Sequence, residues 1–151
     1  MDLSESIEIA ASPERAFSVL SDLTGMGGLS PENTGGQWLD GASSARLGAR
    51  FRGTNERDGD EWSTIAKVTV YEPPTSFAFE VTWQRFRISR WEYNVEATES
   101  GCRVTESWTD RRNAIMRAEG DDDNFTRVEF TKESIHATLV GLKRICELSR
   151  A

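Results

Sequence analysis

The chain has 151 residues, with 18 Lys and Arg against 25 Asp and Glu and a formal net charge of −7. This length fits one domain, residues 1–151, and the acidic balance repels the phosphates of nucleic acids and anionic lipid head groups. No apolar window predicts a membrane span and no signal peptide is evident, so we expect a cytoplasmic protein that does not bind nucleic acid.

The first predicted elements are a strand and a short helix. Apolar residues alternate through residues 3–10, which predicts a strand. Ser12 suits an N-cap and Pro13 suits the first helical position, and apolar residues recur at helical spacing as far as Leu23. The glycines and the proline of residues 25–36 allow no more than one short helical turn.

An extended pattern follows for some seventy residues and predicts six further strands. They are GQWLDG, GARFRGTN, EWSTIAKVTVYEPP, SFAFEVTWQRF, ISRWEYNVEA and GCRVTESWTD. Their alternation predicts an antiparallel sheet with one solvated face. The residues expected on the inner face are Trp62, Thr64, Ala66, Val68, Val70, Phe77, Phe79, Val81, Trp83, Trp91, Tyr93, Val95, Cys102, Val104, Glu106 and Trp108.

The end of the chain combines a charged segment with a helical pattern. Residues 113–124 carry an acidic run without the spacing of a calcium loop, so we expect a solvated loop. From about Phe125 to Ser149 an apolar stripe predicts a long amphipathic helix. The stripe consists of Val128, Ile135, Leu139, Leu142 and Cys146. We expect the two cysteines, Cys102 and Cys146, to be buried free thiols.

This order of elements predicts an α+β fold in which a curved antiparallel sheet wraps around the terminal helix. A curved sheet cannot pack flush along a straight helix, so a gap is expected between them. The inner face holds four tryptophans, a tyrosine and a carboxylate, whereas a dry core favours aliphatic side chains. We therefore favour a pocket for a small molecule, and the alternative is that the aromatic rings fill a large core.

Several segments, taken in order, resemble the SRPBCC superfamily. They are SIEIAASPERAFSVLSDL, SPENTGGQWL with LGARFRGTN, the strand and turn ending in YEPP, WEYNVE with GCRVTESW, and HATLVGLKRICE. The likeness is to its polyketide cyclase/dehydrase and lipid-transport branch, related to START domains. It implies a helix-grip fold with a seven-stranded sheet, a long helix and an apolar cavity between them. Members bind lipids, polyketides or other hydrophobic molecules, and some cyclise or dehydrate polyketide chains.

The resemblance also suggests that residues 29–39 lie near the entrance of the cavity. Leu29 and Trp38 would then flank a mouth, although Trp38 could equally anchor an edge strand. Asn55 could direct an amide into the cavity or take part in a turn. The predicted ligand-binding residues are Trp38, Phe51, Asn55, Trp62, Thr64, Phe79, Trp83, Trp91, Tyr93, Trp108 and Leu139.

Two residues are candidates for acid–base catalysis. Burial of Glu106 would raise its pKa toward neutrality. Its candidate partners are Arg50, Arg52 and an indole N–H, and pairing with an arginine would make it a structural ion pair instead. His136, the only histidine, could reach a ligand from the helix or simply pack at the edge of the apolar stripe.

Five arginines form another cluster, which is either a solvated rim or a site for an acidic head group. They are Arg85, Arg87, Arg90, Arg111 and Arg112.

The leading functional prediction is a module that binds a small hydrophobic ligand without a cofactor. The alternative is a polyketide cyclase or dehydratase that moves protons through Glu106, His136 or Tyr93. A third possibility is an interaction protein whose outer face binds another protein. With one histidine and no nucleotide-binding motif, no metal site is expected. Exposed edge strands could pair in a homodimer or be protected.

Overall fold

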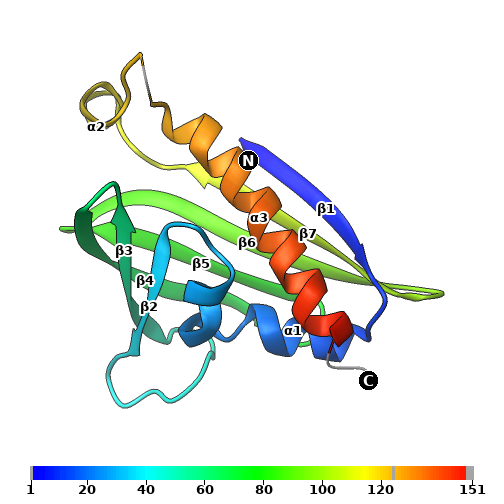
Figure 1. Cartoon of the computed structure of the whole chain (residues 1–151). Coiled ribbons are helices and arrows are strands. Elements are labelled where there is room, and N and C mark those ends of the chain that lie inside the picture. Colours follow the sequence, from blue (N-terminus) through cyan, green and yellow to red (C-terminus); the bar gives the residue numbers. More distant parts are fainter. Residues whose placement is uncertain (1, 124, 149–151) are drawn as a thin grey trace.

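The computed structural model describes residues 2–123 and 125–148. Its centre is one antiparallel sheet of seven strands in the order β1-β7-β6-β5-β4-β3-β2, which curves beneath a long helix (Figure 1). The strands are β1 (Leu3–Ile9), β2 (Asn33–Trp38), β3 (Arg50–Arg57), β4 (Asp60–Glu72), β5 (Ser76–Trp83), β6 (Phe86–Thr98) and β7 (Gly101–Asp110). All seven strands predicted from the alternation of apolar residues are therefore present.

The helix α1 (Pro13–Leu20) begins as the sequence predicts. The Ser12 hydroxyl accepts a hydrogen bond from the Arg15 backbone N–H at 3.1 Å, and Pro13 opens the helix. The buried ring of Phe17 packs edge-on against Tyr71 and Phe77, with ring centroids 5.7 and 6.2 Å away. This contact fastens α1 to one end of the sheet. A 3₁₀ helix, η1 (Leu23–Gly28), follows and is the one short turn expected before β2.

A β-bulge in β4 changes one predicted position. The register shifts between Val68 and Val70, so that Val70 pairs with Ala78 and Tyr71 pairs with Phe77. An extra residue in one strand reverses the alternation beyond it. The prediction that Val70 faces inward is therefore wrong, and Tyr71 takes the inner position and joins the core.

The helix α3 (Arg127–Leu148) lies across the sheet and packs mainly against β1 and α1. Ile135, Leu139, Leu142 and Cys146 are buried, as the apolar stripe predicts. Val128 is 41% exposed, because the buried part of the helix begins only at Thr131. Both cysteines are buried free thiols, which confirms that prediction.

The segment before α3 differs from the expected loop. It contains a short helix, α2 (Ala114–Gly120), whose N-cap Asn113 accepts a hydrogen bond from the Met116 backbone N–H at 2.9 Å. None of the residues of α2 is buried, so the segment is solvated as predicted but partly helical, and the acidic run follows the helix. The helix places this segment over one end of the sheet, beside the start of α3 (Figure 1).

Candidate functional site

A cavity of about 650 Å³ lies between the inner face of the sheet, the first half of α3 and the α2 segment. Strands β3 to β7 supply most of its wall, and Thr131, Ser134 and Thr138 face it from α3. The packed half of α3 is apolar, whereas the half that faces the cavity presents hydroxyl groups. The cavity therefore combines aromatic and aliphatic side chains with many polar and charged groups, a composition that suits an amphipathic small molecule.

Most of the residues predicted to form the site line this cavity. They are Phe51, Asn55, Trp62, Thr64, Phe79, Trp83, Trp91, Tyr93, Glu106 and Trp108. The period-two alternation brings them together, because inner positions of neighbouring strands fall opposite one another. For Asn55 the structure favours the cavity over a turn, since it lies within β3 and its amide nitrogen is 3.5 Å from the Thr64 hydroxyl.

The structure places the other predicted residues away from the cavity. His136 is exposed, and its Nδ1 lies 2.8 Å from a carboxylate oxygen of Glu5 on the outer surface. Leu139 is part of the dry core. Trp38 packs edge-on against Phe51, with centroids 5.1 Å apart, and faces a separate surface pocket beside α1. None of the three belongs to the lining of the cavity, and His136 is paired with Glu5 outside it.

The segment of residues 29–39 contributes to the cavity through other side chains than expected. Leu29 is buried against α3, where a Cβ added to Gly141 would lie 3.2 Å from its Cδ2 atom. Ser30, Glu32 and Asn33 line the cavity instead. The large apolar residue thus attaches the segment to the helix, and the polar residues after it form the wall.

Glu106 and Tyr93 form a buried polar pair on the cavity wall. They are direct neighbours on β7 and β6, and the Tyr93 hydroxyl donates a hydrogen bond to Glu106 Oε2 at 2.8 Å. The sequence leaves the partner of Glu106 open, and the phenol of Tyr93 is not among the candidates Arg50, Arg52 and an indole N–H. Both arginines lie on the solvent side of β3. The other carboxyl oxygen, Oε1, is shielded from solvent and has no hydrogen-bond partner among the described residues.

The surroundings of this pair favour its neutral form. The pKa of Glu106 is raised from 4.5 to about 8, because the effect of burial outweighs the Tyr93 hydrogen bond, which lowers the pKa, and the negative charge of Glu5 raises it further. The pKa of Tyr93 is raised well above 10 by burial, by the charge of Glu106 and by their hydrogen bond. Near pH 7 Glu106 is therefore mostly protonated and can donate a proton toward the cavity.

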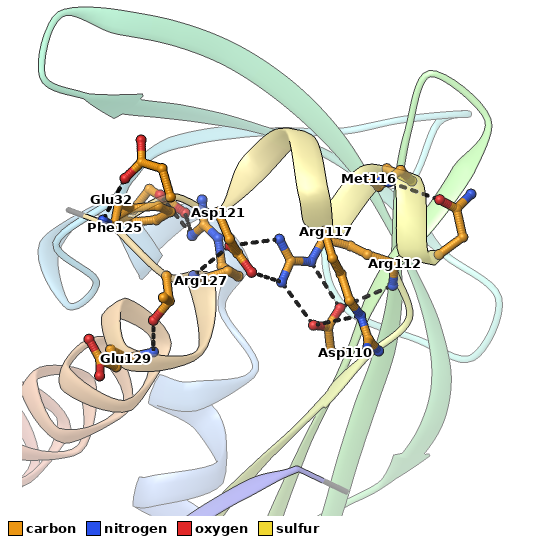
Figure 2. Close-up of polar contacts among 12 residues, drawn as sticks. Glu32, Asp110, Arg112, Met116, Arg117, Asp121, Phe125, Arg127 and Glu129 are labelled. Atoms are coloured by element: carbon orange, nitrogen blue, oxygen red, sulfur yellow. Dashed lines mark hydrogen bonds and ion pairs between the residues drawn. The ribbon is translucent and has the colours of Figure 1, made fainter.

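Three arginines line the end of the cavity near α2, and sequence reasoning identified only Arg112 among them. The Arg112 guanidinium donates two hydrogen bonds to Asp110, at 3.0 and 2.9 Å, and two longer ones to Asp121 (Figure 2). Asp121 also accepts from the backbone N–H of Arg127, the first residue of α3. Arg112 thus joins the end of β7 to the start of α3.

The buried ion pair shifts the ionisation of its carboxylate. Burial raises the pKa of Asp110, but hydrogen bonds from Arg112 and the charges of Arg112 and Arg117 outweigh this effect and lower it. The side chains of Arg112 and Asp110 are only 10% and 5% exposed. This arginine is therefore a structural connector and not a rim group.

Arg127 and Arg57 surround an aromatic pair at the same end. Arg127 donates to both carboxylate oxygens of Glu32 at 3.0 Å, which fixes the β2 side of the cavity to α3. The Arg57 guanidinium carbon lies 3.6 Å from the ring centroid of Phe125, and Phe125 lies 5.7 Å from Phe130. Alternation from Phe51 through Asn55 could have predicted that Arg57 points inward. Its contact with Phe125 could not be predicted in this way, because the two residues are far apart in the sequence.

The remaining arginines of the predicted cluster lie outside the cavity. Arg90 pairs with Glu92 at 3.0 Å, and Arg111 lies 3.7 Å from Glu80. Arg85 and Arg87 are exposed near the β5–β6 hairpin. For these four residues the solvated rim is the interpretation that the structure supports.

Comparison with known proteins gives a family and a fold. The family model for polyketide cyclase / dehydrase and lipid transport matches residues 1–147. A search of curated proteins found no match. None of the helices in the described part of the chain is long and apolar enough to cross a membrane.

Solved structures share the arrangement over nearly the whole chain. The polyketide-cyclase-like protein Cgl2372 from Corynebacterium glutamicum is 30% identical, with 97% of this chain and 91% of that one covered and a TM-score of 0.61. The di-domain ARO/CYC protein StfQ from the steffimycin biosynthetic pathway is 11% identical, covers 98% of this chain and 51% of its own, and gives a TM-score of 0.74. Ara h 8.0201 is 14% identical, with 95% of each chain covered and a TM-score of 0.67.

At 11% and 14% identity the last two structures show the fold alone. The family match over residues 1–147 and the 30% identity to Cgl2372 carry the assignment further. The chain belongs to the polyketide cyclase/dehydrase and lipid transport family of the SRPBCC superfamily and has the helix-grip fold.

Proposed function

We propose that this protein binds a small hydrophobic or aromatic molecule, lipid- or polyketide-like, in the cavity under α3. The observation that carries the proposal is a chamber of about 650 Å³ whose walls include Trp62, Trp83, Trp91 and Trp108. This volume lies in the range of pockets that enclose organic ligands, and flat aromatic walls favour ligands with rings or long apolar chains. The family's description, which includes lipid transport, supports the same class of ligand.

A pair of matched variants tests this proposal. Thr64 faces the cavity from β4, and the neighbouring Ser63 is exposed on the outer face of the same strand. Thr64→Phe should fill the chamber and Ser63→Phe should leave it open. The purified proteins would be screened against aromatic and fatty compounds by thermal unfolding, because a ligand that binds only the folded state raises the Tm.

We expect several compounds to raise the Tm of the wild type and of Ser63→Phe but not that of Thr64→Phe. Native mass spectrometry should show one bound molecule per chain in the first two proteins. Equal binding by all three proteins would place the ligand outside the cavity and defeat the proposal.

A second candidate function is acid–base catalysis of the cyclase or dehydratase type. It is favoured by one observation, the unpartnered Oε1 atom of a protonated Glu106 on the cavity wall, among the residues that the structure describes. A neutral carboxyl group there can donate a hydrogen bond or a proton to a ligand carbonyl, and Tyr93 holds the other oxygen in place. Glu106→Gln should then abolish turnover of a bound polyketide-like substrate and preserve its binding. Unchanged turnover would remove Glu106 from the mechanism.

A cytoplasmic location and a homodimer also stay predictions. In the sheet, β1 and β2 are the edge strands that a second copy could pair with. Size-exclusion chromatography with light scattering separates a monomer from a dimer.

A further inference from the structure

We propose that the ligand carries an anionic group, a carboxylate, sulfonate or phosphate, which the Arg57 guanidinium binds at the α2 end of the cavity. This inference rests on the proposed binding function and specifies the chemical class of the ligand. It concerns the last residue of β3, which faces inward in the same alternation as Phe51 and Asn55.

The guanidinium of Arg57 is held in place but has no acceptor among the described residues. Its carbon atom stacks over Phe125 at 3.6 Å and lies 6.0 Å from the ring of Phe130. Its Nη1 atom is shielded from solvent and has no hydrogen-bond partner there. No ion pair joins Arg57 to a carboxylate within residues 2–123 and 125–148. A cation stacked on aromatic rings and lacking a counter-ion is suited to receive an anion from a ligand.

The other two arginines that line the cavity already have carboxylate partners. Arg112 is neutralised by Asp110 and Asp121, and Arg127 is neutralised by both oxygens of Glu32. The positive charge of Arg57 is therefore the one left without a partner among the arginines that line the described cavity. A bound anion would also meet a guanidinium whose plane Phe125 already fixes, so that little conformational entropy is lost.

The acidic residues nearby are the main objection to an anionic ligand. Asp60 and Glu61 line the cavity from the adjoining strand, and Asp60 is the register partner of Arg57. Both residues are exposed, and neither forms an ion pair with Arg57 at 4.0 Å or less. Their charges are screened by solvent, whereas that of Arg57 lies against aromatic rings. We therefore expect the attraction of Arg57 for a bound anion to exceed the repulsion from Asp60 and Glu61.

The position of Arg57 also defines the rest of the ligand. The neutral Glu106 carboxyl lies on β7, and the tryptophan rings line the wall along with it. The molecule that satisfies these groups is amphipathic, with an apolar or aromatic body, an acid at one end and a carbonyl or hydroxyl oxygen that can face Glu106.

Two fluorescent probes that differ only by a sulfonate group test the proposal. Anilinonaphthalene sulfonate carries the anion, and its uncharged parent phenylnaphthylamine lacks it. Both would be titrated into the wild type, Arg57→Gln, Arg57→Lys and Arg52→Gln. Arg52 is exposed on the outer face of the same strand, so its variant matches the change in net charge without touching the cavity.

We expect Arg57→Gln to raise the Kd of the sulfonate probe by about tenfold, as the loss of a charged hydrogen bond implies. The Kd of the uncharged probe should change by less than about twofold. Arg57→Lys should recover part of the lost affinity, and Arg52→Gln should change neither probe. A uniform loss for both probes would show that Arg57 only supports the fold, and no change in either would show that it does not bind the anion. Both results overturn this inference.

The proposed binding function is tested separately by the uncharged probe. Binding of phenylnaphthylamine to the wild type but not to Thr64→Phe supports the cavity whatever Arg57 does. Failure of both probes to bind the wild type would overturn the cavity proposal and the inference together.

Discussion

Tyr93 and Glu106 face each other across β6 and β7, and the only hydrogen bond of the buried carboxyl comes from the phenol, within the described part of the chain. The two residues form a polar pair in a wall that also holds Trp91 and Trp108. Because the carboxyl is buried and its one partner there is uncharged, its protonation is linked to folding.

Glu106 should make the protein less stable as the pH rises. Its pKa is raised from 4.5 to about 8 in the folded state, so the folded protein binds the proton more tightly than the unfolded chain. The resulting stabilisation is complete below about pH 4.5, falls by about 1.4 kcal/mol for each pH unit up to about pH 8, and is absent above it. Urea unfolding of the wild type and Glu106→Gln between pH 5 and pH 9 measures this effect as a difference between the two proteins.

The Gln variant keeps the shape of the side chain without the titration. We expect its free energy of unfolding to fall less steeply with pH, so that the advantage of the wild type at pH 5 disappears by pH 9. Parallel curves for the two proteins would show that Glu106 does not titrate in this range.

Removal of the phenol should shift the same carboxyl further. The Tyr93 hydrogen bond lowers the pKa of Glu106 and opposes the effect of burial. Tyr93→Phe should therefore raise the pKa of Glu106 above about 8. The side-chain carboxyl carbon of Glu106 can be followed by NMR across the titration, with the exposed Glu99 in the same spectrum as an internal control. A lower pKa of Glu106 in Tyr93→Phe than in the wild type would contradict the hydrogen bond from Tyr93 to this carboxyl.

Arg112 should contribute more to stability than its neighbour Arg117. The Arg112 side chain is 10% exposed and holds Asp110 and Asp121, whereas that of Arg117 is 53% exposed and lies 3.5 Å from Asp110. Arg112→Ala leaves a buried carboxylate without its main partner, which we expect to cost about 3 kcal/mol. Arg117→Ala should cost less than about 1 kcal/mol. Equilibrium unfolding in urea compares the two, and equal losses would refute the connector role of Arg112.

Gly101 should resist any side chain, because the β6–β7 turn brings it close to the N-terminal strand. It has a φ of 156°, and an added Cβ would lie 2.2 Å from the Ile9 carbonyl oxygen and 2.7 Å from the Ala11 nitrogen. Both contacts are to backbone, so the chain itself would have to move. Gly101→Ala should lower the free energy of unfolding by about 2 kcal/mol or more. Gly28→Ala, where an added Cβ meets nothing within 4 Å, is the matched control and should change it by less than about 1 kcal/mol.

The order of elements and most of the cavity wall can be predicted from the sequence. Alternation identifies a strand and also the side each residue faces, so the pattern alone assigns Trp62, Trp91 and Trp108 to one surface. It fails at Val70, because a bulge leaves no mark in the pattern of apolar residues. It does not reveal the short helix α2 either, because seven residues are too few to show a helical repeat of apolar side chains.

The contacts that define the chemistry of the site depend on register and distance. Alternation predicts that Tyr93 and Glu106 both face inward, but only the pairing of β6 with β7 shows that they bond. The stacking of Arg57 on Phe125 joins residues from distant parts of the chain. His136 lies one position away from a buried residue on α3, and that single step turns it toward Glu5 and the outer surface.

The pairing of Leu3 with Trp108 has a consequence for how the protein is made. The first strand to leave the ribosome must wait for the last one, and α3, which packs against both, is translated later still. Until β7 emerges, β6 is an open edge, and until α3 emerges the tryptophan-lined wall is uncovered, so a nascent chain exposes the surface that the finished protein encloses.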